Sequence, residues 1–143
     1  MTINQLSIFV ENKTGTIAEI TKKIADAGIS IRALSVAETQ GYGILRLIVS
    51  DVETAKNILS TDNCVVSITK VIAVEIPDTP GGLSNVLKLV SENGINVEYL
   101  YAFIAVSGKH AYVVLRVEDN EKAVKILSEN GISLVKPEDI VSL

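Results

Sequence analysis

The segment Asn12-Lys13-Thr14-Gly15 returns in altered form as Asp78-Thr79-Pro80-Gly81, and the recurrence extends along the chain. After each segment, an amphipathic stretch ends at a Gly-Ile pair, Gly28-Ile29 in one case and Gly94-Ile95 in the other. The differences 81 − 15 and 94 − 28 both equal 66, and farther on the offset becomes 119 − 51 = 68. These offsets indicate an internal duplication with two residues inserted in the second repeat.

Each repeat predicts the element order β-α-β-β-α-β. Alternating apolar residues predict the strands, and apolar residues at helical spacing, such as Ile17, Ile20 and Ile24, predict the helices. In the first repeat we expect strands at 6–10, 29–38, 44–49 and 65–68 and helices at 17–27 and 51–59. In the second repeat we expect strands at 71–76, 95–106, 111–117 and 132–135 and helices at 83–90 and 121–129.

This element order predicts an α+β fold made of two ferredoxin-like βαββαβ sandwiches in tandem. In such a sandwich the sheet is antiparallel and both helices cover one of its faces. The expected domains are residues 1–69 and 70–143. No Gly/Ser/Pro-rich linker separates the repeats, since only residues 67–70, which overlap the end of the strand at 65–68, lie between the two apolar strands. We therefore expect the two domains to abut rigidly.

Composition argues against several classes of partner. The net charge is −4 and aromatic residues make up 4% of the chain, which disfavours nucleic-acid binding. No apolar run approaches the roughly 18 residues of a membrane span. The single cysteine, Cys64, and the single histidine, His110, predict no intramolecular disulfide and no structural metal site. We therefore expect a cytoplasmic protein without a metal or cofactor and without a membrane partner.

The repeated turn carries groups that suit a zwitterion. Gly15 and Gly81 allow a ligand to approach the backbone closely, and the following helix presents unpaired N–H groups that favour a carboxylate. An ammonium group needs an oxygen acceptor, which Asn12 or Asp78 could supply. The alternative is an ordinary turn with a helix cap, and the duplication does not separate the two interpretations because it copies caps and sites alike.

The full pattern resembles the ACT domain, twice over nearly the whole chain. It comprises a strand, Asn/Asp-x-Pro/Thr-Gly, an amphipathic helix, Gly-Ile-Asn/Ser, two strands, a helix and a strand. The resemblance implies regulatory domains that bind small ligands, most often amino acids, at interfaces between paired domains. Carried onto this chain, the implied ligand-binding residues are Asn12, Gly15 and Ser30 in the first repeat and Asp78, Gly81, Gly82 and Asn96 in the second.

Tyr99 and Tyr101 lie on one face of a predicted strand, together with Phe103. One interpretation is that these rings pack against a neighbouring sheet or domain. The other is that one or two of them line the pocket for a ligand side chain, which would favour a large amino acid.

These observations predict a regulatory protein and not an enzyme. The sequence offers no nucleophile paired with a base and no metal-ligand cluster. We expect a homodimer that binds a small molecule and modulates a separate metabolic enzyme. The resemblance to ACT domains implies that this small molecule is an amino acid. The alternative function is a ligand-free interaction module that dimerises through its sheets.

Overall fold

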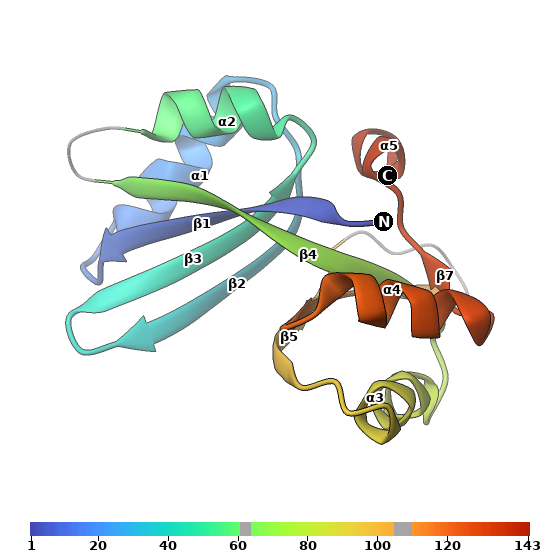
Figure 1. Ribbon diagram of the computed structural model, residues 1–143. Helices are drawn as coiled ribbons and strands as arrows, with labels where there is room; N and C mark the ends of the chain where they lie inside the picture. The colour runs from blue at the N-terminus through green and yellow to red at the C-terminus, as the bar shows by residue number, and fades with distance from the viewer. Residues whose placement is uncertain (61–63, 105–109) are drawn as a thin grey trace.

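The computed structural model describes residues 1–60, 64–104 and 110–143 and is shown in Figure 1. The strands are β1 (Ile3–Glu11), β2 (Ile31–Thr39), β3 (Tyr42–Val49), β4 (Val65–Pro77), β5 (Val97–Ala102), β6 (His110–Val117) and β7 (Ser133–Leu134). The helices are α1 (Thr16–Asp26), α2 (Val52–Leu59), α3 (Gly82–Glu92), α4 (Asn120–Glu129) and α5 (Pro137–Ser142). The predicted α+β class and the repeated element order are confirmed.

One strand belongs to both repeats. Residues 67–70, expected as a short link, lie inside β4, where each of them pairs with a residue of β1. β1 pairs with residues 65–71 of β4, and β6 pairs with residues 72–77. The strand order is β2-β3-β1-β4-β6-β5, with β7 also beside β4, and the pairs are antiparallel.

Each repeat buries its own core between its part of the sheet and two helices (Figure 1). In the first repeat, α1 and α2 bring Ile20, Ile24 and Leu59 against β1 and β3. In the second repeat, α3 and α4 do the same against β4 and β6 with Val90 and Leu127. Burial of these aliphatic side chains is the main driving force that folds each sandwich.

The second helix of each repeat begins with the same side-chain cap. Asp51 accepts a hydrogen bond from the backbone N–H of Thr54 at 3.1 Å, and Asp119 accepts one from Lys122 at 3.0 Å. The Thr54 hydroxyl also donates to Asp51, and this bond, with the backbone bond, lowers the pKa of the Asp51 carboxyl. The caps explain why these short helices start where the sequence predicts.

A third core lies between the two repeats, on the faces of the sheet that the helices leave free. It contains Ala33 and Ile48 from the first repeat and Phe103 and Val114 from the second. The two ends of the strand order meet here, because Ala33 forms an isolated antiparallel bridge with Phe103. The sheet therefore curls on itself, and the two repeats share a buried interface.

The C-terminal region differs from the prediction. The last strand is shorter than expected, and residues 136–143, for which no element was predicted, include the helix α5. Its Ile140 is buried in the third core, and Arg32 donates to the carbonyl oxygens of Ile140 and Val141. Residues 105–109, on which part of a predicted strand falls, lie outside the described residues. Within the described ranges, no helix is long and apolar enough to cross a membrane.

Candidate functional site

Glycine, and not an Asx side chain, starts the first helix of each repeat. Gly15 and Gly81 occupy the N-cap positions of α1 and α3 with φ values of 90° and 91°, and no side chain caps either helix. A residue with a Cβ is strained in this left-handed conformation. The next residue in the second repeat, Gly82, is buried against the carbonyl group of Pro77. The shared geometry of the two turns therefore depends on Gly15 and Gly81.

The polar residues that open the two turns are exposed. The Asn12 side chain donates to a carboxylate oxygen of Glu38 at 3.2 Å, so it is already engaged on β2. Asp78 makes no hydrogen bond or ion pair within the described part of the chain, so its carboxylate is available. Neither residue caps a helix, and both stay predictions as ligand contacts.

The polar residues that follow the helices lie far from the turns. Ser30 exchanges hydrogen bonds with Ser50 after α1, and Asn96 is exposed after α3. α3 has 11 residues and is therefore about 16 Å long, so Asp78 and Asn96 stand at opposite ends of it. A single small ligand within one repeat cannot contact both residues. The two groups predicted from the sequence do not form one pocket.

The tyrosines belong to the interface between the repeats. Gln5, which is fully buried, accepts a hydrogen bond from the Tyr101 hydroxyl at 2.7 Å. Its amide nitrogen donates to Ser7 and to the Tyr99 hydroxyl, both at 2.9 Å. Burial raises the pKa of the Tyr101 hydroxyl well above its usual range. The guanidinium of Arg46 lies 3.7 Å from the centroid of the Tyr99 ring. This geometry matches the packing interpretation of both rings.

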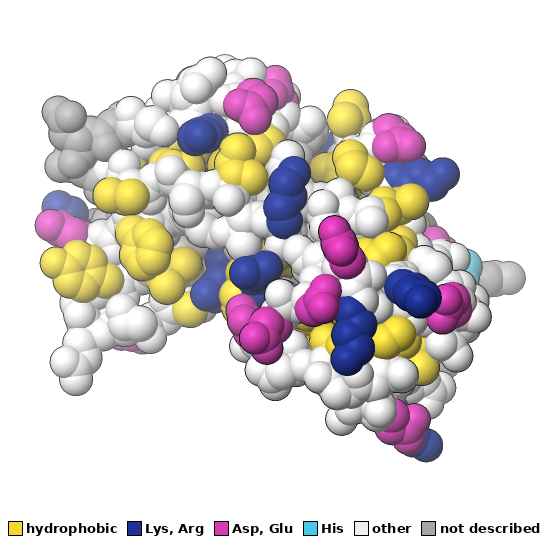
Figure 2. Space-filling model, in the orientation of Figure 1, with side chains coloured by type: hydrophobic (Ala, Val, Ile, Leu, Met, Phe, Trp, Pro, Cys, Tyr) yellow, Lys and Arg dark blue, Asp and Glu magenta, His cyan; other side chains and the backbone are white. Residues whose placement is uncertain are grey.

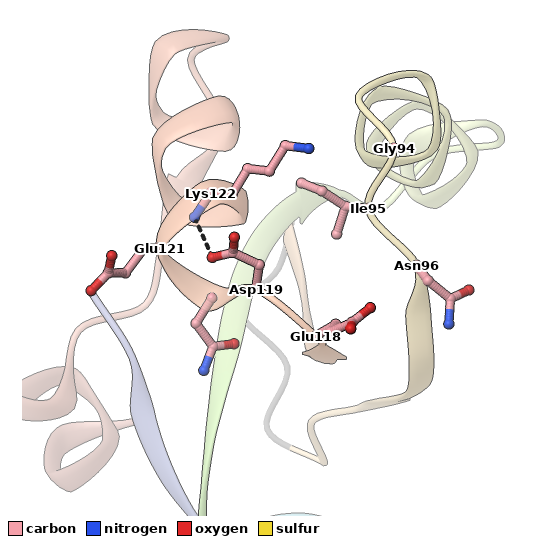
Figure 3. Close-up of a pocket in the computed structure, with 8 residues that line it drawn as sticks. Gly94, Ile95, Asn96, Glu118, Asp119, Glu121 and Lys122 are labelled. Carbon is pink, nitrogen blue, oxygen red and sulfur yellow. Dashed lines mark hydrogen bonds between the residues drawn. The ribbon is translucent and has the colours of Figure 1, made fainter.

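The predicted residue Asn96 lines a pocket at the corner between α3 and α4 (Figure 3). We call it the corner pocket, and its volume is about 480 Å³. One wall is the chain that leaves α3, and the other is the β6–α4 connection with the first turn of α4. The lining residues are Gly94, Ile95, Asn96, Glu118, Asp119, Asn120, Glu121 and Lys122.

The corner pocket combines a cation, carboxylates and an unused buried acceptor. The side-chain nitrogen of Asn120 donates to the backbone carbonyl of Lys70 at 3.3 Å, which orients its amide. The other amide atom, Oδ1, is buried and accepts no hydrogen bond from the described residues. Lys122 extends across the pocket toward Gly94, and Glu118 belongs to the wall formed by the β6–α4 connection (Figure 3). A buried acceptor without a partner is costly unless something fills it.

In the corresponding corner of the first repeat, hydrogen bonds between Ser30 and Ser50 join the two walls directly. At the offset of 68, Ser50 and Val52 take the positions of Glu118 and Asn120. They line a cavity of only about 90 Å³ together with Pro137, Ile140 and Val141 of the α5 segment. This cavity lacks residues 28–30, the equivalents of the wall that carries Asn96, so it is not the counterpart of the corner pocket.

Sequence reasoning missed Asn120 and Lys122. The repeat alignment held a signal, because the apolar Val52 of the first repeat corresponds to the polar Asn120 of the second. Val52 packs against the first core, so a polar residue in its place needs a reason other than packing.

Comparison with known proteins agrees with the duplication seen in the fold. A family model described as an ACT domain pair matches residues 1–143. The chain belongs to the ACT domain pair family. ACT domains are regulatory domains, and the ACT resemblance predicted from the sequence is confirmed. No curated protein matches the chain.

Solved structures share the arrangement of the pair. Protein BT0572 from Bacteroides thetaiotaomicron is 37% identical with a TM-score of 0.91, and the match covers 100% of this chain and 98% of that one. The ligand-free regulatory subunit of aspartate kinase from Thermus thermophilus is 15% identical with a TM-score of 0.65, covering 90% and 92% of the two chains. A structure of aspartokinase alpha and beta subunits is 21% identical with a TM-score of 0.57, covering 87% and 90%. The last two support the fold alone.

Proposed function

We propose that this ACT domain pair is a sensor that binds an amino acid in the corner pocket and regulates a separate protein. The observation that carries the proposal is Asn120, which lines the same pocket as Lys122 and whose buried Oδ1 has no partner among the described residues. The Thermus protein with this fold is named as a regulatory subunit, and this supports a partner on another chain.

The pocket residues can recognise both ends of a zwitterion. The ammonium of Lys122 and the side-chain amide nitrogen of Asn96 are donors for an α-carboxylate. Asn120 Oδ1 and the carboxylate of Glu118 are acceptors for an α-ammonium. Asp119 is less available, because one of its oxygens already caps α4. A bound amino acid would then hold the two walls of the pocket in one position. It would favour one conformation of the domain pair, and the partner protein would bind that conformation differently.

A thermal unfolding screen against the twenty amino acids tests this proposal. We expect one or a few of them to stabilise the protein, by about 2.7 kcal/mol at 100 times the dissociation constant. Lys122→Met should remove most of the shift, because it deletes the ammonium and keeps the backbone N–H that Asp119 caps. Lys125→Met is the matched control on the same helix, outside the pocket.

Two outcomes would contradict the proposal. A shift that survives in both Lys122→Met and Asn120→Leu would place the ligand elsewhere. The absence of a shift with every amino acid would favour the ligand-free interaction module.

Exposed apolar residues also favour a homodimer. Leu34 and Val36 on β2, Leu100 on β5 and the adjoining Ile104 are 37–56% exposed and lie where the two edge strands meet. We call these residues the seam patch. Leu34 and Leu100 are equivalent at the offset of 66, so the patch carries the symmetry of the duplication, and a second copy of the chain can cover it with the same surface.

Light scattering after size-exclusion chromatography tests the homodimer. We expect twice the chain mass of 15.3 kDa at micromolar concentration. Val36→Glu should shift the protein to the monomer, because it places a charge inside an apolar contact. Val141→Glu, at an exposed apolar position outside the patch, should leave the mass unchanged. A wild-type monomer would be evidence against this assembly.

A further inference from the structure

A second pocket, in the first repeat, differs in chemistry from the corner pocket. It lies between α1 and the strand ends of β1, β3 and β4 and has a volume of about 430 Å³. We call it the α1 pocket. Its lining residues are Phe9, Val10, Glu11, Lys13, Thr16, Glu19, Ile20, Lys23, Tyr42, Cys64 and Val65. None of them belongs to the corner pocket, and none was predicted from the sequence as a site residue.

The apolar wall of this pocket is unusually exposed. Phe9, Tyr42 and Val65 are 48%, 59% and 69% exposed. Figure 2 shows hydrophobic side chains gathered over the ends of β1, β3 and β4, where these residues lie. Large apolar side chains grouped at the surface lose the free energy that burial would provide, and such groups mark binding surfaces.

The second repeat shows that the fold does not require these aromatic residues. Glu75 takes the place of Phe9 at the offset of 66, and His110 takes the place of Tyr42 at the offset of 68. These two residues contact each other, with His110 Nδ1 3.0 Å from a carboxylate oxygen of Glu75. The same strand ends thus fold with polar side chains in one repeat and with exposed aromatic rings in the other. A role in binding accounts for the difference.

The polar wall of the α1 pocket is also peculiar to the first repeat. The Thr16 hydroxyl is buried and has no hydrogen-bond partner among the described residues, whereas the equivalent position in the second repeat is Gly82. Lys13 and Lys23 line the pocket, and their counterparts, Thr79 and Leu89, carry no charge.

The two lysines of the α1 pocket balance its two glutamates in formal charge. Lys13 contacts Glu11 at 3.4 Å, but Lys23 and Glu19, one turn apart on α1, form no ion pair within the described part of the chain. Thr16 is the first residue of α1, so the positive end of the helix dipole adds to the two ammonium groups. The helix dipole therefore favours an anionic head group beside Thr16.

We propose that the α1 pocket binds a carboxylic acid with an apolar body, such as an aryl or branched alkyl group. The apolar body contacts Phe9, Tyr42 and Val65, and the carboxylate accepts hydrogen bonds from the Thr16 hydroxyl and the ammonium of Lys23. The protein then has two unlike sites, one in each repeat. This proposal is independent of the amino-acid site in the corner pocket, because the two pockets share no residue.

Cys64 provides a direct reporter of occupancy, because it is the only cysteine in the chain and lines the pocket. The experiment measures the rate of its alkylation by iodoacetamide, by intact mass, with phenylpropionate as the probe. We expect the rate to fall about elevenfold at ten times the dissociation constant of the probe. Phenylpropanol, which lacks the carboxylate, should need at least a tenfold higher concentration than phenylpropionate to give the same protection of Cys64. Equal protection by the alcohol and the acid would overturn the proposal.

Two variants locate the contacts. Thr16→Val keeps the shape and deletes the unused hydroxyl, so we expect it to raise the unfolding midpoint of the free protein and to weaken phenylpropionate about tenfold. Phe9→Ala should weaken the binding of the acid and of the alcohol alike, and Val141→Ala, at an exposed apolar position outside the pocket and the seam patch, should weaken neither. Unfolding midpoints show that each variant is folded.

The same variants separate a ligand site from a contact between two copies of the chain. If Phe9→Ala changes the mass in solution and leaves the protection unchanged, the exposed wall is a contact between copies and the proposal is wrong. Lys122→Met should leave the protection of Cys64 intact, so a failure of the corner pocket as an amino-acid site would not affect this result.

Discussion

Gln5→Ala is expected to destabilise the protein by roughly 3–5 kcal/mol. Gln5 is fully buried on β1 and joins the first repeat to Tyr99 and Tyr101 of the second. Its removal leaves the Tyr101 hydroxyl without its acceptor in a buried interface and opens a cavity beside it. Both effects are costly, because a buried polar group without a partner keeps none of the hydrogen bonds that water would supply.

Urea denaturation of the two variants Gln5→Ala and Asn4→Ala measures the effect. Asn4 is the neighbouring residue on β1, and its side chain accepts a hydrogen bond from the exposed ammonium of Lys70. We expect Asn4→Ala to change the free energy of unfolding by less than about 1 kcal/mol. If Gln5→Ala costs no more than the control, the network between the repeats contributes specificity and not stability.

The elements of each repeat could be predicted from the sequence because they depend on local patterns. Periodic apolar residues marked the strands and helices, and the offsets aligned the two repeats. The helices predicted at 51–59 and 121–129 start beside Asp51 and Asp119, whose side chains accept hydrogen bonds from Thr54 and Lys122. The boundary between the repeats was harder, because residues 67–70 contain polar side chains that suggested a link, whereas pairing with β1 keeps them in the strand.

The interface between the repeats could not be predicted, because it depends on pairs of residues far apart in the chain. Gln5 and Tyr101 are 96 positions apart, and nothing local distinguishes Gln5 from an exposed strand residue. The corner pocket depends in the same way on residues 94–96 and 118–122, which are far apart in the chain. The helix α5 was missed for a different reason. A helix of six residues with a single buried side chain, Ile140, has too little periodicity to be recognised.

Geometry explains why the sequence predicted only part of the candidate site. Each residue group suggested by the turns and helix ends lies where the local pattern places it. Helix α3 then separates Asp78 from Asn96, so the two groups cannot share one ligand within a repeat. The polar residues that do surround Asn96 come from the β6–α4 connection, which no motif in the sequence singled out.

The two turn positions that follow the N-cap glycines should respond differently to alanine. Gly82→Ala should destabilise the protein by about 3 kcal/mol, because the new Cβ would overlap the backbone carbonyl oxygen of Pro77. Helix propensity alone predicts the reverse sign, since alanine is favoured over glycine in a helix by about 1 kcal/mol. The clash outweighs that gain, because a backbone carbonyl cannot move aside as a flexible side chain can.

Thr16→Ala is the matched control at the equivalent position of the first repeat. A side chain already fits there, and its hydroxyl makes no hydrogen bond to the described residues, so we expect a change of less than about 1 kcal/mol. Both free energies come from denaturant unfolding of the full chain. If Gly82→Ala is instead more stable than the wild type, the turn relaxes away from Pro77, and the glycine at position 82 is not required by packing. If it is destabilised as expected, packing restricts the residue at position 82 more than the residue at position 16. The turn before α1 can then accept a side chain that contacts a ligand, whereas the turn before α3 cannot.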